Sequence, residues 1–84
     1  MKHFASPEFW AAYNSLPDHV RTLADRSYQR LKADPTHPSL HFKRIGEVYS
    51  VRIGLHYRAL GTAVDDGIIW FWIGTHADYD KLIR

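Results

Sequence analysis

The chain has 84 residues, no cysteine, a formal net charge of +2 and an isoelectric point of about 9.1. This length predicts one domain over residues 1–84, and the absence of cysteine excludes a disulfide scaffold and a thiolate metal site. No stretch reaches the ~20 apolar residues of a membrane span, and the first residues do not resemble a signal peptide. We therefore expect a cytoplasmic protein that folds on packing alone and does not contact a membrane.

The first part of the chain predicts two helices. Residues 2–5 are compatible with a short edge strand. Ser6 and Pro7 then form a helix start, with serine as the N-cap and proline at the first helical position. Apolar residues at helical spacing follow, namely Phe9, Trp10, Tyr13 and Leu16. A second amphipathic helix is predicted over residues 18–33, with an inner face of Val20, Leu23, Ala24, Ser27 and Leu31.

His37, in the loop at residues 34–39, and His41, shortly after it, have the spacing of a helical metal pair. Pro38 lies between them and argues against a helix, and the glutamate of the metalloprotease motif is absent. We therefore expect no bound metal and no other cofactor.

The rest of the chain predicts four strands, at about 40–45, 47–53, 57–64 and 68–75. We expect three-residue loops that pair residue 53 with 57 and residue 64 with 68. A two-residue turn at Asp66-Gly67 is the alternative in the second hairpin.

This register predicts one apolar face, made of Tyr49, Val51, Ile53, Tyr57, Ala59, Gly61, Ala63, Ile69, Phe71 and Ile73. The predicted fold class is therefore α+β, with two N-terminal helices packed on this face of a small twisted antiparallel sheet. The opposite face then carries Ser50, Arg52, Arg58, Leu60, Thr62, Trp70, Trp72 and, at the strand end, His76.

Arg52 lies directly opposite Arg58 in this register. Like charges that face each other across strands are destabilising. Either both guanidinium groups splay into solvent, or they bind an anion together, for which phosphate has the matching geometry. Two exposed indoles, Trp70 and Trp72, predict a binding surface that stacks on bases or receives an apolar helix of a partner.

The segment "WFWIGTHADYD" ends an apolar strand with side chains that can transfer protons. A histidine side chain can give or take a proton, and we expect Gly74 to let the chain turn so that His76 reaches the arginine pair. Asp78 is the expected group that orients the ring or raises its pKa. In the alternative, His76 only caps the strand or bonds to Asp78, and Tyr79 is a packing residue.

The order of helix, helix, loop and antiparallel strands, with "VYSVRIGLHYRALG" and a terminal "GTHADYDKL", resembles the RelE/ParE superfamily of toxins from bacterial type II toxin–antitoxin systems. "YSVRIGLHYRAL" is similar to the Y-x-x-R-x-x-x-x-Y-R hairpin of that family, and "PSLHFKRI" to the strand before it. "GTHADYD" is similar to the Gly-x-His-x-Asp ending of some members that cleave mRNA on the ribosome.

The resemblance implies a microbial-RNase-type fold and, for cleaving members, a metal-independent endoribonuclease that cuts mRNA in the ribosomal A site. The ribose 2′-hydroxyl attacks the adjacent phosphate and yields a 2′,3′-cyclic phosphate. By this resemblance Arg58 stabilises the phosphorane, Arg52 holds phosphate, His76 is the general acid or base, and Tyr79 positions or stacks. Further expected substrate contacts are Lys43, Arg44, Ser50 and Trp72, with Asp78 as the orienting group.

The expected partner of such a toxin is a small acidic antitoxin. Two other functions remain open at this point. One is a non-cleaving toxin of the same fold that inhibits gyrase or another target. The other is a degenerate member that mainly binds its antitoxin.

Overall fold

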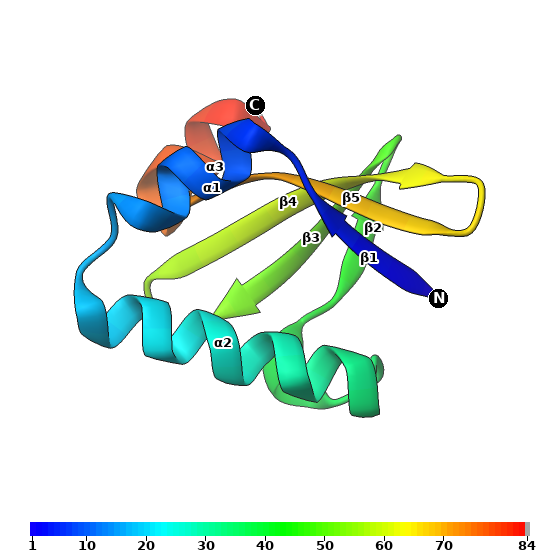
Figure 1. The fold of residues 1–84 in the computed structure, drawn as a ribbon, viewed down its shortest axis with the longest axis horizontal. Coiled ribbons are helices and arrows are strands. Elements are labelled where there is room, and N and C mark those ends of the chain that lie inside the picture. Colours follow the sequence, from blue (N-terminus) through cyan, green and yellow to red (C-terminus); the bar gives the residue numbers. More distant parts are fainter. Residues whose placement is uncertain (84) are drawn as a thin grey trace.

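The computed structural model describes residues 1–83, and Figure 1 shows the helices arranged beside one sheet. In chain order the elements are β1 (Lys2–Ala5), α1 (Pro7–Asn14), α2 (Asp18–Ala33), the short 3-10 helix η1 (Pro38–Leu40), β2 (Lys43–Ile45), β3 (Val48–Ile53), β4 (Tyr57–Val64), β5 (Gly67–Thr75) and α3 (His76–Leu82). The predicted α+β fold is confirmed. The helix α3 was not predicted.

The two N-terminal helices begin where the sequence signals indicate. Ser6 is the N-cap of α1, and its Oγ accepts a hydrogen bond from the backbone N–H of Phe9 at 3.2 Å. The helix α2 follows Pro17 and spans the predicted residues 18–33. Its buried residues, Val20, Ala24 and Leu31, recur at helical spacing and therefore form one inward face.

The sheet has five strands in the order β1-β5-β4-β3-β2. Neighbouring strands from β2 to β5 are antiparallel, as predicted, but β1 pairs with β5 in parallel. The sheet is therefore mixed rather than purely antiparallel. The predicted edge strand at residues 2–5 is confirmed, and the α1–α2 segment carries the chain from β1 at one edge of the sheet to β2 at the other.

The β3–β4 hairpin has the predicted register, with Ile53 paired with Tyr57. The β4–β5 hairpin does not begin as predicted, because Val64 pairs with Gly67 across a two-residue turn at positions 65 and 66. Pairing of residue 64 with residue 68 is therefore wrong, and so is the proposed alternative turn at Asp66-Gly67.

A β-bulge in β5 restores the predicted register further along the hairpin. Gly61 pairs with Trp70 and Leu60 pairs with Trp72, which leaves Phe71 as an extra residue on β5. Beyond the bulge Ala59 pairs with Ile73, as the three-residue loop would also require. The prediction therefore holds for the half of the hairpin that reaches α3 and fails for the half next to the turn.

The bulge decides which side chains of β5 enter the core, because a shift of one residue moves a side chain to the other face. Trp70 is only 6% exposed and lies in the core, whereas Phe71, which was predicted to be buried, is 37% exposed. Ile68 likewise takes the place predicted for Ile69. The expected pair of exposed indoles at Trp70 and Trp72 is therefore wrong.

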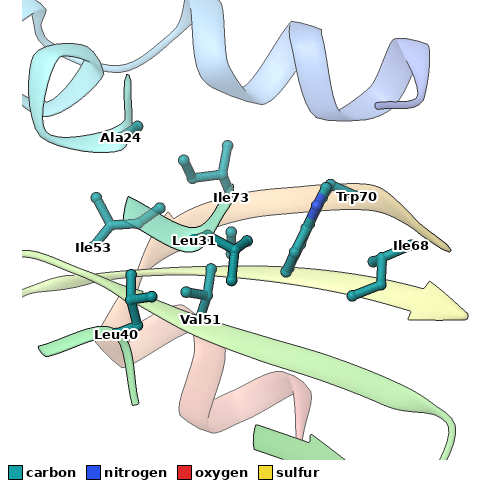
Figure 2. Close-up of a cluster of buried hydrophobic side chains, with 9 residues drawn as sticks. Ala24, Leu31, Leu40, Val51, Ile53, Ile68, Trp70 and Ile73 are labelled. Atoms are coloured by element: carbon teal, nitrogen blue, oxygen red, sulfur yellow. The ribbon is translucent and has the colours of Figure 1, made fainter. Parts of the chain in front are cut away.

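The core lies between the sheet and the two N-terminal helices, with α1 packed against β5 and α2 against β3. Figure 2 shows Trp70 among the aliphatic side chains of this cluster. A Cβ added at Gly61 would lie 2.9 Å from the Trp70 indole, so the missing side chain makes room for the ring. No helix within residues 1–83 is long and apolar enough to cross a membrane.

Candidate functional site

Two arginines face each other on the side of the sheet away from α1 and α2. Arg52 on β3 pairs directly with Arg58 on β4, as predicted, and Arg58 pairs in turn with Gly74 on β5. Because side chains alternate along a strand, the burial of Val51, Ile53 and Ala59 in the helix-covered core places both arginines on the opposite face. The sheet therefore brings two guanidinium groups together at adjacent positions.

Arg52 is held by hydrogen bonds at the end of the β3–β4 hairpin. Its Nε donates to the carbonyl oxygen of Gly54 at 2.9 Å, and its Nη1 lies 3.2 Å from Nε2 of His41. The contact with His41 was not anticipated from the sequence, in which His41 stood out only through its spacing from His37. These two contacts fix the direction of the Arg52 guanidinium beside Arg58.

Arg58 is half-buried and lies beneath the helix α3. Its Cζ is 5.4 Å from the centre of the Tyr79 ring, within the range of a cation–π contact. The Nε and Nη1 atoms of Arg58 are buried, and neither has a hydrogen-bond partner within residues 1–83. The hydroxyl of Tyr79 is buried and unpartnered in the same sense. Such donors suit an anion, because a guanidinium binds phosphate oxygens through its N–H groups.

His76 is the first residue of α3 rather than the last residue of a strand. Thr75 is the N-cap of this helix, and its Oγ1 accepts a hydrogen bond from the backbone N–H of Asp78 at 3.1 Å. His76 Nδ1 lies 3.3 Å from Oδ2 of Asp80, four residues later on the same helix face. The carboxylate that orients His76 is therefore Asp80, and the expectation for Asp78 is wrong.

The helix α3 has a sequence signal that was overlooked. Thr75 followed by Asp78 has the S/T-x-x-D/E spacing that often opens a helix, and the i, i+4 spacing of His76 and Asp80 follows once the helix is assigned. Tyr79, on the same helix, is 2% exposed, and its ring centre is 5.8 Å from that of His76. Tyr79 therefore contacts both His76 and Arg58, the other two predicted catalytic residues.

Gly74 serves the site differently from the expected way. Its φ is not positive, so it provides no special turn toward His76. A Cβ at this position would lie 2.5 Å from Cζ2 of Trp72, so the glycine makes room for the indole. The half-buried ring of Trp72 therefore lies over Gly74, the residue that pairs with Arg58.

The remaining predicted contacts do not all reach the arginine pair. Lys43 is exposed and pairs with Ser50 on the same face. Ser50 itself is 0% exposed and its Oγ is unpartnered within the described residues, so its predicted contact with a substrate does not fit the structure. Arg44 points the other way, with its Cζ 5.6 Å from the Tyr49 ring centre and its Nε bonded to the Gly46 carbonyl at 2.8 Å.

The histidine pair in the loop has no metal-binding geometry. His37 caps η1, where its Nδ1 accepts from the backbone N–H of Ser39 at 3.2 Å. His41 faces Arg52, as described above. Among residues 1–83, no three histidine, cysteine, aspartate or glutamate side chains gather as a metal site would require.

A family model of the ParE-like toxin domain matches residues 18–81 of the chain. This range begins with α2 and includes the arginine pair and most of α3. No curated protein sequence matches the chain.

Several solved structures share the fold. A chain from the crystal structure of a RelB-RelE antitoxin-toxin complex from Methanococcus jannaschii superposes with a TM-score of 0.72 at 16% identity, and the match covers 96% of this chain and 99% of that one. A copper-bound mutant toxin from Helicobacter pylori superposes with a TM-score of 0.68 at 16% identity, and the match covers 93% of this chain and 97% of that one. The isolated RelE toxin of E. coli superposes with a TM-score of 0.64 at 12% identity, and the match covers 98% of this chain and 97% of that one. At such identities the likeness concerns the fold.

Proposed function

Because this chain belongs to the ParE-like toxin domains of the RelE/ParE superfamily, we propose that it is a ribosome-dependent endoribonuclease that inhibits translation by cleaving mRNA. Its proposed partner is a small acidic antitoxin that holds it inactive. A solved structure of the same fold is an antitoxin-toxin complex, which supports such a partner.

The buried and unpartnered donors of Arg58 carry this proposal. Buried guanidinium N–H groups without an acceptor are costly, because desolvation removes their water and no hydrogen bond replaces it. Arg52 lies directly across from it, which raises the cost further in the absence of a ligand. A phosphate group of RNA supplies the missing negative charge and the missing acceptors together.

The proposed reaction uses four side chains. The 2′-oxygen of the ribose attacks the adjacent phosphorus, the bond to the 5′-oxygen of the next nucleotide breaks, and the products are a 2′,3′-cyclic phosphate and a 5′-hydroxyl. Arg58 stabilises the charge of the phosphorane, Arg52 holds the phosphate, and Tyr79 keeps the Arg58 guanidinium in place. Nε2 of His76 accepts the proton that the 2′-hydroxyl loses, since its Nδ1 is directed to Asp80, and the same nitrogen then returns that proton to the leaving 5′-oxygen.

The test is cleavage of mRNA on programmed ribosomes, with the product ends identified. Wild-type protein should yield 2′,3′-cyclic phosphate ends without added metal, and Arg58→Ala should reduce the rate by about a hundredfold or more, through lost charge stabilisation. Arg26→Ala, an exposed arginine on α2, is the control and should cleave like wild type.

Circular dichroism should show both variants folded, so that the loss in Arg58→Ala is chemical. If wild-type protein arrests growth but leaves ribosome-bound mRNA intact, the ribonuclease proposal fails. A non-cleaving inhibitor of gyrase or another target then becomes the better account.

A further inference from the structure

His41 stands at the end of the row formed by the two arginines. β2 pairs with β3 so that Lys43 is opposite Ser50. Continuing this antiparallel register by two residues places His41 opposite Arg52. Arg52 is in turn opposite Arg58. The three side chains therefore belong to neighbouring positions on one face of the sheet.

The contact between His41 and Arg52 has a defined chemistry. Nε2 of His41 lies 3.2 Å from Nη1 of Arg52. A guanidinium can only donate, so Nε2 must be the acceptor nitrogen and the ring proton must lie on Nδ1. With Nε of Arg52 bonded to the Gly54 carbonyl, the guanidinium is held at two points, and its Nη2 group remains to donate to an anion.

The backbone of His41 is unusual in a way that concerns its ring. His41 has φ 42° and ψ 41°, and it is the one non-glycine residue with positive φ in residues 1–83. It ends η1, with its N–H donating to the carbonyl of Pro38 at 3.2 Å. Glycine or asparagine usually occupies such a left-handed cap, because a larger side chain is disfavoured there.

The residues on both sides hold His41 in this conformation. Leu40 is 1% exposed in the core, and the ring of Phe42 stacks on Tyr49 with 5.5 Å between centres. His41 thus adopts a backbone conformation that favours glycine, and its ring contacts Arg52 of the proposed phosphate site. This combination points to a function for the ring.

We propose that His41 is a positioning residue of the phosphate site, which aims the Arg52 guanidinium at the scissile phosphate by accepting its Nη1–H bond. This inference rests on the phosphate-binding role of Arg52 in the proposed function. Glycine should fit this left-handed backbone at least as well as histidine whichever role the ring has, but only the loss of a positioning residue should weaken RNA binding.

The test is a double-mutant cycle between His41→Gly and Arg52→Ala, read out as affinity for a short single-stranded RNA by fluorescence anisotropy. His41→Gly should unfold at the same or a higher temperature than wild type, because glycine accepts the backbone conformation. It should nevertheless bind RNA about fivefold more weakly, and the double variant should bind no more weakly than Arg52→Ala alone.

Two further variants sharpen the test. His41→Asn should recover part of the affinity, because asparagine tolerates the left-handed conformation and offers an amide oxygen as acceptor. His19→Ala, an exposed histidine on α2, controls for loss of an imidazole and should bind RNA like wild type. Wild-type affinity in His41→Gly, or losses that multiply in the double variant, would overturn the inference.

Cleavage on programmed ribosomes, measured in parallel, separates this inference from the proposed function. Coupling between the two residues in RNA binding, with no cleavage by wild-type protein, removes the ribonuclease and leaves the role of His41 intact. Cleavage by wild-type protein without coupling overturns only the role of His41. If wild-type protein cleaves on ribosomes but does not bind free RNA, the same cycle is read from cleavage rates, and independent losses then overturn the role of His41. Failure both to bind RNA and to cleave overturns both proposals.

Discussion

His76 and Arg58 are supported in different ways, and the difference suits the two tasks proposed for them. The His76 side chain is 44% exposed and is oriented by Asp80, so its ring can exchange protons with solvent or substrate. Arg58 is more enclosed, with Tyr79 over its guanidinium and two donors without partners in the described chain. Charge stabilisation is stronger where water is excluded, whereas proton transfer needs access.

Replacement of His76 by glutamine should lower the rate of mRNA cleavage by at least about a hundredfold, since a placed general acid or base contributes about 10²–10⁴-fold. Glutamine keeps the size and a hydrogen bond to Asp80 but cannot transfer a proton at neutral pH. The measurement is single-turnover cleavage on programmed ribosomes. His19→Gln is the matched control on α2 and should retain the wild-type rate. Cleavage by His76→Gln at the wild-type rate would make His76 a helix-start residue and nothing more.

At the scale of elements, the short helix α3 assembles the site. It follows β5 directly, and its single cap at Thr75 sets where the helix begins. One turn of helix then brings Tyr79 onto the sheet face and places Asp80 beside His76. A strand in place of this helix would send successive side chains to opposite sides. The site therefore depends on the change from strand to helix at residue 76.

Removal of the α3 cap by Thr75→Ala should cost about 1 kcal/mol of unfolding free energy and also lower cleavage, because His76 and Tyr79 lose their fixed positions. Ser6→Ala removes the equivalent cap of α1, where Ser6 Oγ accepts from the N–H of Phe9. It should cost a similar free energy in chemical denaturation and leave cleavage unchanged. Equal loss of cleavage in both variants would mean that general stability, and not the geometry of α3, limits activity.

At the scale of the whole molecule, the sheet separates two surfaces with different chemistry. The face under α1 and α2 holds the apolar core, which β1 closes through contact with β5. His3 on β1 contributes to that closure, since its Nδ1 accepts from the indole N–H of Trp70 at 3.1 Å. The other face carries the arginine pair, and α3 covers part of it.

Stability should fall on acidification through His3. Burial, followed by the positive N-terminus and Lys32, lowers the pKa of His3 below its ordinary 6.5. Between the folded and the unfolded pKa of His3, the unfolded chain binds more protons than the folded chain. The stabilisation that neutral His3 gives to the folded state is therefore fully present above about pH 6.5 and is lost as the pH falls through the folded pKa. Unfolding midpoints at pH 7.5 and pH ~5 should therefore differ less in His3→Gln than in wild type. Identical pH dependence of the two proteins would contradict this role of His3.

The proposed antitoxin should anchor on Trp72. This half-buried indole lies against Gly74, the residue that pairs with Arg58, and an apolar ring near a cationic position suits an acidic amphipathic segment. Tryptophan is also enriched among residues that dominate binding energy. Trp72→Ala should weaken antitoxin binding by about tenfold or more in titration calorimetry. Trp10→Ala is the control, because Trp10 is 49% exposed on α1, across the sheet from the arginines. A larger loss for Trp10→Ala would move the anchor to the helical surface.

The local signals in the sequence determined most of the elements and part of the site. Ser6-Pro7 and Pro17-Asp18 set the starts of α1 and α2, because capping and proline geometry act within one turn. Alternation of polar and apolar residues determined the β3–β4 register, and with it the facing of Arg52 and Arg58. In these segments the local signals were enough to predict the element and its register.

Tertiary structure decided what local pattern could not. The bulge at Phe71 arises where Trp70 and Gly61 fit each other across strands, and periodicity alone predicted the wrong indole surface. The pairing of His41 with Arg52 needs a left-handed backbone held by Leu40 and Phe42, which only the packed core supplies. Burial of Ser50 and of the Arg58 donors likewise depends on what covers the sheet, and that is a property of elements brought together from distant parts of the chain.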